Sequence, residues 1–259
     1  MDIKKLVIIP DADNIEKSIS LASGYGTGFE YNDFFIPSLM EDEKAFGQRI
    51  EFYRDKVKDM PFSTLHGAFL DITVFSDDPK IKAVSDLRVR QSMDAAKALG
   101  VKGVVFHTNY MASFLSERYR DNWVIRNYEY FLGIMKEYPG IEIYMENMFD
   151  EDPELLKRLA EKFEVGGQFG VCFDYAHAHV FGKGASIEKW CEDLSPYIMH
   201  VHINDNDLKE DQHLAVGKGS IDWKAFKDNY NKYFGDASVL LEVRGYDRIK
   251  DSLDYIKAL

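Results

Sequence analysis

The stretch GQFGVCFDYAHAH, residues 167–179, contains the pattern that decides the fold of this chain. An apolar run, residues 171–173, leads directly into Asp174, and His177 follows three residues later. This order is typical of a buried strand that carries polar side chains at its carboxyl end. Five other stretches have the same form: STLHGAF (63–69), GVVFHTN (103–109), IEIYMEN (141–147), IMHVHIND (198–205) and VLLEVRG (239–245). We therefore expect six strand ends to converge on one site.

The rest of the chain places amphipathic helices between apolar strands. An Asp78-Pro79 pair opens one helix and Gly100 ends it, as capping chemistry predicts. Strands are expected at 6–10, 28–35, 61–66, 101–107, 141–147, 169–174, 197–204 and 238–243. Helices are expected at 15–22, 41–58, 77–99, 114–138, 152–163, 186–194, 223–234 and 249–259. Eight such units without a linker predict a single α/β domain, residues 1–259, folded as a (β/α)₈ TIM barrel. An open doubly wound sheet is the alternative, but no G-x-G-x-x-G follows the first strand.

Composition narrows the environment and the partners of the protein. The formal net charge of −12 over 259 residues does not indicate a basic surface for nucleic acid. The chain has two cysteines, Cys172 and Cys191, which is typical of a reducing compartment. It has neither a signal-peptide pattern nor an apolar run of about 18 residues. We therefore expect a cytoplasmic protein without a membrane span. The sequence leaves open whether it forms a homo-oligomer.

Acidic residues and histidines gather at the predicted strand ends and in the loop after the seventh strand. They are His66, His107, Glu146, Asp174, His177, His202, Asp211, His213 and Glu242. All seven histidines of the chain lie in these segments, with His179 expected to leave the pocket and His200 to lie one layer below His202. Imidazoles and carboxylates that face one barrel mouth favour a divalent metal, Zn²⁺ or Mn²⁺.

Two kinds of chemistry fit such a site. A carboxylate on either side of one metal suits proton transfer at a carbon next to a carbonyl, which is isomerisation or epimerisation of a sugar. A cluster of three metals with more histidine ligands suits hydrolysis of a phosphodiester. The residues alone leave both open.

The motifs HGAFLDI, VVFH, MEN, FDYAH, HINDN, DQHLAVGKG and LLEVRG resemble the xylose isomerase-like barrel superfamily, over about residues 60–245. This superfamily includes sugar phosphate isomerases and epimerases, ketose 3-epimerases and endonuclease IV. The resemblance to the epimerases implies one divalent metal held by Glu146, Asp174, His202 and Glu242. It also implies that Glu146 and Glu242 act as the acid/base pair and that the substrate contacts His177. His66, His107, Lys218 and Arg244 are further candidates for contact with the hydroxyls or a phosphate of a sugar.

The resemblance to endonuclease IV implies a different ligand set. Each of its nine zinc-ligand positions has a matching residue here, which adds His66, His107, His177, Asp211 and His213 to the four ligands above. However, LVIIPDAD (6–13) and GFEYNDFF (28–35) match neither the His-x-Ser…Gly-Gly nor the Lys-Asn-x-Arg segment of the nucleases, and phosphate contacts need Lys and Arg. A Phe69-Leu70 pair stands where the nuclease inserts into a duplex, yet isomerase-like members also carry such a pair.

We therefore predict a metal-dependent sugar or sugar-phosphate isomerase or epimerase with a small carbohydrate substrate. The alternative is a trinuclear zinc AP endonuclease or phosphodiesterase. A dehydratase, or a binding protein that the metal only stabilises, would also use this site.

Overall fold

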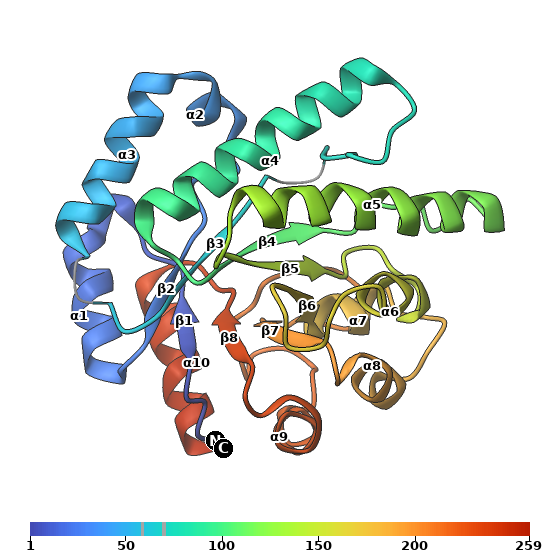
Figure 1. Cartoon of the computed structure of the whole chain (residues 1–259). Helices are drawn as coiled ribbons and strands as arrows, with labels where there is room; N and C mark the ends of the chain where they lie inside the picture. The colour runs from blue at the N-terminus through green and yellow to red at the C-terminus, as the bar shows by residue number, and fades with distance from the viewer. Residues whose placement is uncertain (58–59, 69–70) are drawn as a thin grey trace.

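The computed structural model describes residues 1–57, 60–68 and 71–259 and contains a closed barrel of eight parallel strands (Figure 1). Each strand pairs with the next along the chain, and β8 pairs back with β1, where Val7 lies opposite Leu240. The strands are β1 (Leu6–Ile8), β2 (Gly28–Tyr31), β3 (Ser63–His66), β4 (Gly103–His107), β5 (Glu142–Glu146), β6 (Phe169–Asp174), β7 (Ile198–Ile203) and β8 (Ser238–Leu241). This closure confirms the predicted (β/α)₈ barrel and rules out the open sheet.

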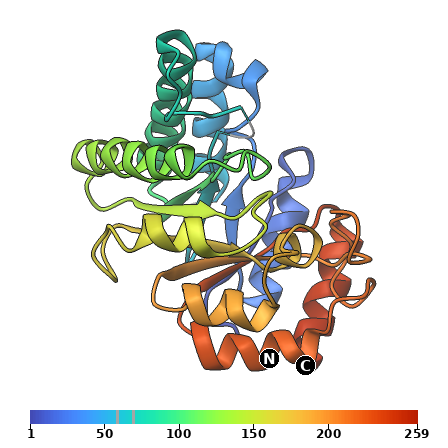
Figure 2. The same cartoon turned by 90° about the vertical axis from the view of Figure 1, so that its right-hand side faces the viewer.

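The helices surround the barrel (Figures 1 and 2). They are α1 (Ile15–Tyr25), α2 (Pro37–Glu41), α3 (Glu43–Lys56), α4 (Pro79–Leu99), α5 (Glu117–Glu137), α6 (Glu154–Ala160), α7 (Tyr175–Val180), α8 (Ile187–Leu194), α9 (Trp223–Asn229) and α10 (Tyr246–Ala258). A π-helical segment, Tyr230–Phe234, continues α9. The two termini lie side by side, and the amino group of Met1 donates to the Ile256 carbonyl at 2.9 Å. Within the described residues, no helix is long and apolar enough to cross a membrane.

Helix α4 begins and ends where capping chemistry predicts. The Asp78 carboxylate accepts a hydrogen bond from the Lys80 N–H at 2.8 Å, and Gly100 takes the left-handed conformation (φ 68°) that ends the helix. The amino-terminal half of α4 extends past the barrel (Figure 1). As a result Val84 and Leu87 remain about half exposed, although the apolar periodicity of this helix continues through them.

Several predicted boundaries were wrong, some of them for clear local reasons. The strand expected over 28–35 ends at Tyr31, because the Asp33 carboxylate accepts a hydrogen bond from the Tyr53 hydroxyl at 2.6 Å and pairs with Arg49, which directs the chain toward α3. The helix expected from residue 114 begins at Glu117, since the Ser116 hydroxyl caps it. The helix expected over 41–58 is divided at Asp42, whose carboxylate caps α3, and α3 ends at Lys56. The Phe69-Leu70 pair falls outside the described residues.

Candidate metal centre

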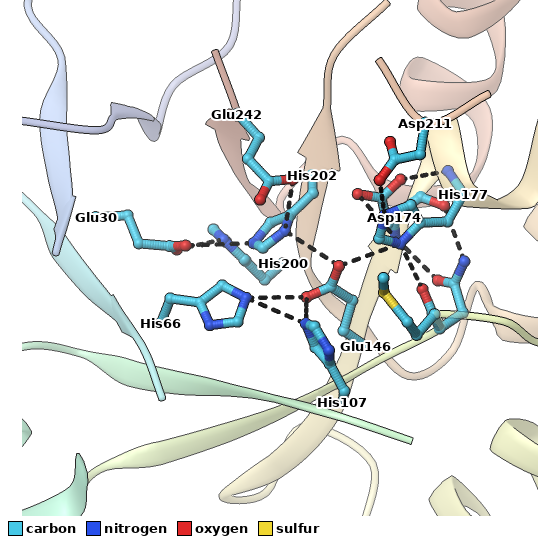
Figure 3. Close-up of polar contacts among 12 residues, drawn as sticks. Glu30, His66, His107, Glu146, Asp174, His177, His200, His202, Asp211 and Glu242 are labelled. Atoms are coloured by element: carbon cyan, nitrogen blue, oxygen red, sulfur yellow. Dashed lines mark hydrogen bonds and ion pairs between the residues drawn. The ribbon is translucent and has the colours of Figure 1, made fainter. Parts of the chain in front are cut away.

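Six strand ends deliver acidic residues and histidines to one mouth of the barrel. His66, His107, Glu146 and Asp174 end β3, β4, β5 and β6, His202 lies near the end of β7, and Glu242 follows β8 directly. Parallel strands of a barrel all have their carboxyl ends at the same face. The side chains therefore meet above the barrel core, as Figure 3 shows.

Four of these residues converge on a single point. One donor atom each from Glu146, Asp174, His202 and Glu242 lies within 4.8 Å of the other three. Each of the four residues also has a buried polar atom that forms no hydrogen bond within the described part of the chain: Glu146 Oε2, Asp174 Oδ2, His202 Nδ1 and Glu242 Oε2. Buried polar groups without partners are costly, and three carboxylates with one imidazole are a donor set that a divalent cation satisfies. The residues therefore fit a metal ion.

The charges at this point are poorly balanced without a cation. Burial raises the pKa of Asp174 to about 7. The negative charges of Glu146 and Glu242 add to this shift, whereas the charge of His177 partly offsets it. Burial lowers the pKa of His213, but its hydrogen bond to Asp211 and the charge of Glu242 outweigh this effect and raise that pKa to about 9. Burial is the larger cause of the Asp174 shift, whereas neighbouring carboxylates cause the His213 shift, so a nearby cation would lower both pKa values.

Glu146 lies at the centre of the cluster and faces histidines on two sides (Figure 3). Its Oε2 atom lies 3.6 Å from His66 Nε2 and 3.3 Å from His107 Nε2. Its Oε1 atom lies 3.4 Å from the Nδ1 atoms of both His177 and His202. Burial would raise the pKa of Glu146, but the charges of His202 and His107 lower it well below its ordinary value. Glu146 is therefore held as a carboxylate.

Two more donor groups flank the central one. The first consists of His66, His107 and Glu146, and the second consists of His177, Asp211 and His213. In the second group, the Asp211 Oδ2 atom lies 3.4 Å from His177 Nε2 and 3.1 Å from His213 Nε2. The structure thus brings all nine predicted donors together in three neighbouring groups.

Backbone carbonyls fix the orientation of three of these imidazoles. The Nδ1 atoms of His66, His177 and His213 donate to the carbonyls of Gly67, Asn147 and Glu242 at 3.1, 2.9 and 3.1 Å. A carbonyl only accepts, so the proton resides on Nδ1 in each case. This leaves Nε2 turned toward the donor groups, which is the arrangement of histidines that bind metals.

Glu30 fixes the orientation of His202, and the sequence reasoning missed it. It is fully buried on β2, accepts hydrogen bonds from His200 Nε2 at 3.0 Å and the Thr64 hydroxyl at 2.7 Å, and lies 3.5 Å from His202 Nε2. Burial would raise the pKa of Glu30, but the charge of His202 and the hydrogen bond from His200 outweigh it and lower that pKa. His202 Nδ1 therefore faces Glu146 and Glu242. The available signal was an acid inside a short buried strand.

His200 and His179 lie where the sequence suggested. His200 is fully buried in the layer below His202, where its Nδ1 atom hydrogen-bonds the Ser238 hydroxyl at 2.7 Å and its ring stacks on Tyr144. His179 packs against Tyr175 and is absent from the described lining of the cavity above the metal centre.

Local hydrogen bonds explain how the chain turns from β6 into α7 within the stretch 167–179. Asn147, directly after Glu146, accepts from the Asp174 N–H and donates to the Asp174 carbonyl, both at 2.9 Å. The Asp174 carboxylate in turn accepts from the His177 N–H at 2.6 Å and caps α7. Asp174 thus ends its strand and starts a helix within one residue, which directs His177 into the mouth.

A cavity of about 340 Å³ lies over the metal centre. Its described lining is Ile9, Asn32, Phe35, His66, His107, Glu146, Met148, His177, Asp211, His213, Glu242, Arg244 and Arg248. Arg244, a predicted substrate contact, lines it, whereas Lys218 is exposed and does not belong to this described lining. Arg248 was not predicted. It donates to the His213 carbonyl from α10.

Comparisons with known proteins agree with this fold. The sequence profile described as xylose isomerase-like TIM barrel matches residues 21–259. The structure of the TTHB071 protein from Thermus thermophilus, obtained after soaking with ZnCl₂, superposes with a TM-score of 0.73 at 24% identity, covering 100% of this chain and 97% of that one. A D-tagatose 3-epimerase-like protein superposes with a TM-score of 0.73 at 19% identity, covering 98% of each chain.

The sequence is also related to a nuclease. It is 26% identical over 169 residues to the probable endonuclease 4 of Mycobacterium leprae, which covers 61% of this chain and 64% of that protein. Both branches named by the resemblance are therefore represented among the similar proteins. Since the family profile spans nearly the whole sequence, the chain belongs to the xylose isomerase-like TIM barrel family.

Proposed function

We propose that this protein is a divalent-metal-dependent isomerase or epimerase of a small carbohydrate. The observation that carries the proposal is the convergence of Glu146, Asp174, His202 and Glu242, each with a buried atom that lacks a hydrogen bond within the described residues, under a cavity of small-molecule size. This donor set would hold one Zn²⁺ or Mn²⁺ ion. When bound, the ion supplies Lewis acidity that polarises a carbonyl and a neighbouring hydroxyl of the sugar.

The residues of the chain would supply the proton transfer. Glu146 and Glu242 come from β5 and β8, which are three places apart around the barrel, so their carboxylates approach the cavity from different directions. One carboxylate removes a proton from the carbon beside the carbonyl, and the other supplies a proton from its own side. The glutamate with a lowered pKa enters the step as the base: burial would raise the pKa of Glu242, but the nearby imidazole of His202 lowers it. The other glutamate must enter the step as a carboxylic acid that has taken a proton from solvent, so that it can deliver this proton to the carbon.

The remaining walls suit a polyhydroxylated ligand. The cavity lining includes the imidazoles of His66, His107 and His177 and the exposed guanidinium groups of Arg244 and Arg248. Phe35, Ile9 and Met148 add apolar surface for the carbon skeleton. These groups would orient the sugar so that the reacting C–H bond faces one of the two glutamates.

The test is to incubate the metal-loaded protein with ketoses in D₂O and to measure by proton NMR whether the sugars take up deuterium. We expect uptake at the carbon next to the carbonyl in at least one sugar of a panel of ketopentoses, ketohexoses and their phosphates. Glu242→Gln is expected to lower the rate at least 100-fold. Uptake that survives Glu242→Gln would mean that the acid/base pair is assigned wrongly.

A zinc phosphodiesterase is the second candidate, because a specific observation favours it. The groups His66–His107–Glu146 and His177–Asp211–His213 would give two further ions places beside the first. The charge of the cavity argues against this candidate. Arg244 and Arg248 are the only Lys or Arg residues in its described lining, whereas binding of a nucleic-acid backbone needs many Lys and Arg contacts to phosphates. Three zinc ions per chain together with cleavage of abasic DNA or of bis(p-nitrophenyl) phosphate, without exchange into any sugar, would establish this alternative.

A further inference from the structure

A second cavity of about 540 Å³ adjoins the metal cavity and has no role in the chemistry above. It lies between the start of α1, the loop after β2 and the start of α10. Ile9 and Arg244 belong to the walls of both cavities, so the two spaces meet across these side chains. The metal cavity by itself is large enough for a free monosaccharide, because pockets for small molecules have volumes from about 300 Å³ upward.

The charges of this second cavity are balanced. Its described lining contains the cations Lys17, Arg49 and Arg244 and the carboxylates Asp11, Asp13 and Asp33. An anion such as a phosphate would therefore meet three carboxylates. A neutral ligand with many hydroxyls fits better, because each hydroxyl can donate to a carboxylate and accept from an ammonium or guanidinium group.

Several of these groups are available to a ligand, whereas others serve the fold. Asp33 pairs with Arg49, and Asp11 accepts from the Asp13 N–H and the Asn14 amide within its own loop. The side chains of Asp13, Lys17 and Arg244, by contrast, make no hydrogen bond or ion pair to any residue that the structure describes. One acceptor group and two donor groups of the cavity lining are therefore available to a ligand.

An aromatic ring completes the lining. Tyr246, the first residue of α10, lines the second cavity and is 45% exposed, although large aromatic side chains usually bury most of their surface. Its face offers an apolar platform for the C–H groups of a sugar ring, and its hydroxyl keeps contact with water. An exposed ring beside unpaired donors and acceptors is a combination suited to carbohydrate.

We propose that the second cavity binds an additional sugar unit, so that the substrate is a glycoside or disaccharide whose other end reaches the metal centre. This inference rests on the proposed carbohydrate chemistry. Arg244 lies at the junction and contacts both sugar units, whereas Tyr246, Asp13 and Lys17 contact the distal unit only.

The test compares D-fructose with isomaltulose, a disaccharide that contains the same fructose unit and an added glucose unit. Dissociation constants are measured by ligand-observed NMR with the zinc-loaded full chain. We expect isomaltulose to bind about tenfold more tightly than D-fructose, and Tyr246→Ala and Asp13→Asn each to reduce this ratio several-fold. Tyr255→Ala is the matched control: this tyrosine is also partly exposed on α10, at 39%, but does not belong to the described lining of the second cavity.

Equal dissociation constants for the two sugars, or a ratio that neither variant changes, would overturn the proposal. The measurement is independent of catalysis, so its outcome is separate from that of the deuterium-uptake test. Failure of the proposed reaction would appear as missing uptake even where isomaltulose binds in the expected way.

Discussion

Replacement of Glu30 by glutamine should weaken metal binding although Glu30 is not a ligand. The Glu30 carboxylate lies 3.5 Å from His202 Nε2, where two unit charges would attract by about 5 kcal/mol at an effective dielectric constant near 20; the imidazole that binds a metal is neutral and keeps only a fraction of this energy. Glutamine keeps an acceptor oxygen for His200 and Thr64, so only part of this energy is lost. We expect the dissociation constant for Zn²⁺ to rise by about 10- to 100-fold, the usual effect of losing a partner behind a metal-bound histidine.

The assay is competition for Zn²⁺ with a chromophoric chelator, and thermal melts of the metal-free proteins serve as a check on folding. Glu142→Gln is the matched control, since Glu142 also carries a carboxylate on a barrel strand but begins β5 at the opposite end, where it pairs with Lys102 at 2.7 Å. The control should bind zinc like the wild type. Zinc affinity in Glu30→Gln within twofold of the wild-type value would refute the role assigned to Glu30.

Three other perturbations have defined outcomes. Chelation should lower the melting temperature of the zinc-loaded wild type but not that of Asp174→Asn, because saturation at 100 times the dissociation constant adds about 2.7 kcal/mol to stability; equal shifts would contradict the ligand assignment. Burial raises the pKa of Asp150 to about 6, so between the pKa of the unfolded chain and pH 6 only the folded state keeps the proton. The contribution of Asp150 to the free energy of unfolding should therefore fall by ~3 kcal/mol as the pH rises through this window, measured as the difference between urea titrations of the wild type and of Asp150→Asn. Gly219→Ala should cost about 1–3 kcal/mol, because a Cβ atom there would lie 2.3 Å from Asp205 Oδ1, whereas Gly24→Ala, with open space around it, should not destabilise the fold in the same denaturant assay.

The barrel and its donors could be predicted because both follow from short-range patterns. An apolar run that ends in Asp174 or Glu146 identifies a strand end, and the geometry of a closed barrel then brings such ends together. The position of His200 below His202 follows in the same way from the two-residue period of a strand.

Features that depend on side chains meeting across the barrel could not be predicted. Glu30 on β2 meets His202 on β7 through the barrel interior, and no spacing along the chain indicates that contact. The same holds for Arg248, which reaches the cavity rim from α10. In helix α4 the sequence pattern indicates more burial than the structure shows. Its apolar period continues through Val84 and Leu87, but the barrel it packs against ends before them.

The most direct test of the metal centre is anomalous diffraction at the zinc edge from crystals of the zinc-loaded protein. The structure predicts a peak surrounded by Glu146, Asp174, His202 and Glu242, at about 2.0–2.2 Å from the ligating oxygen and nitrogen atoms. A map with no peak at this point, or with zinc only beside His66 and His107 or beside Asp211 and His213, would contradict it.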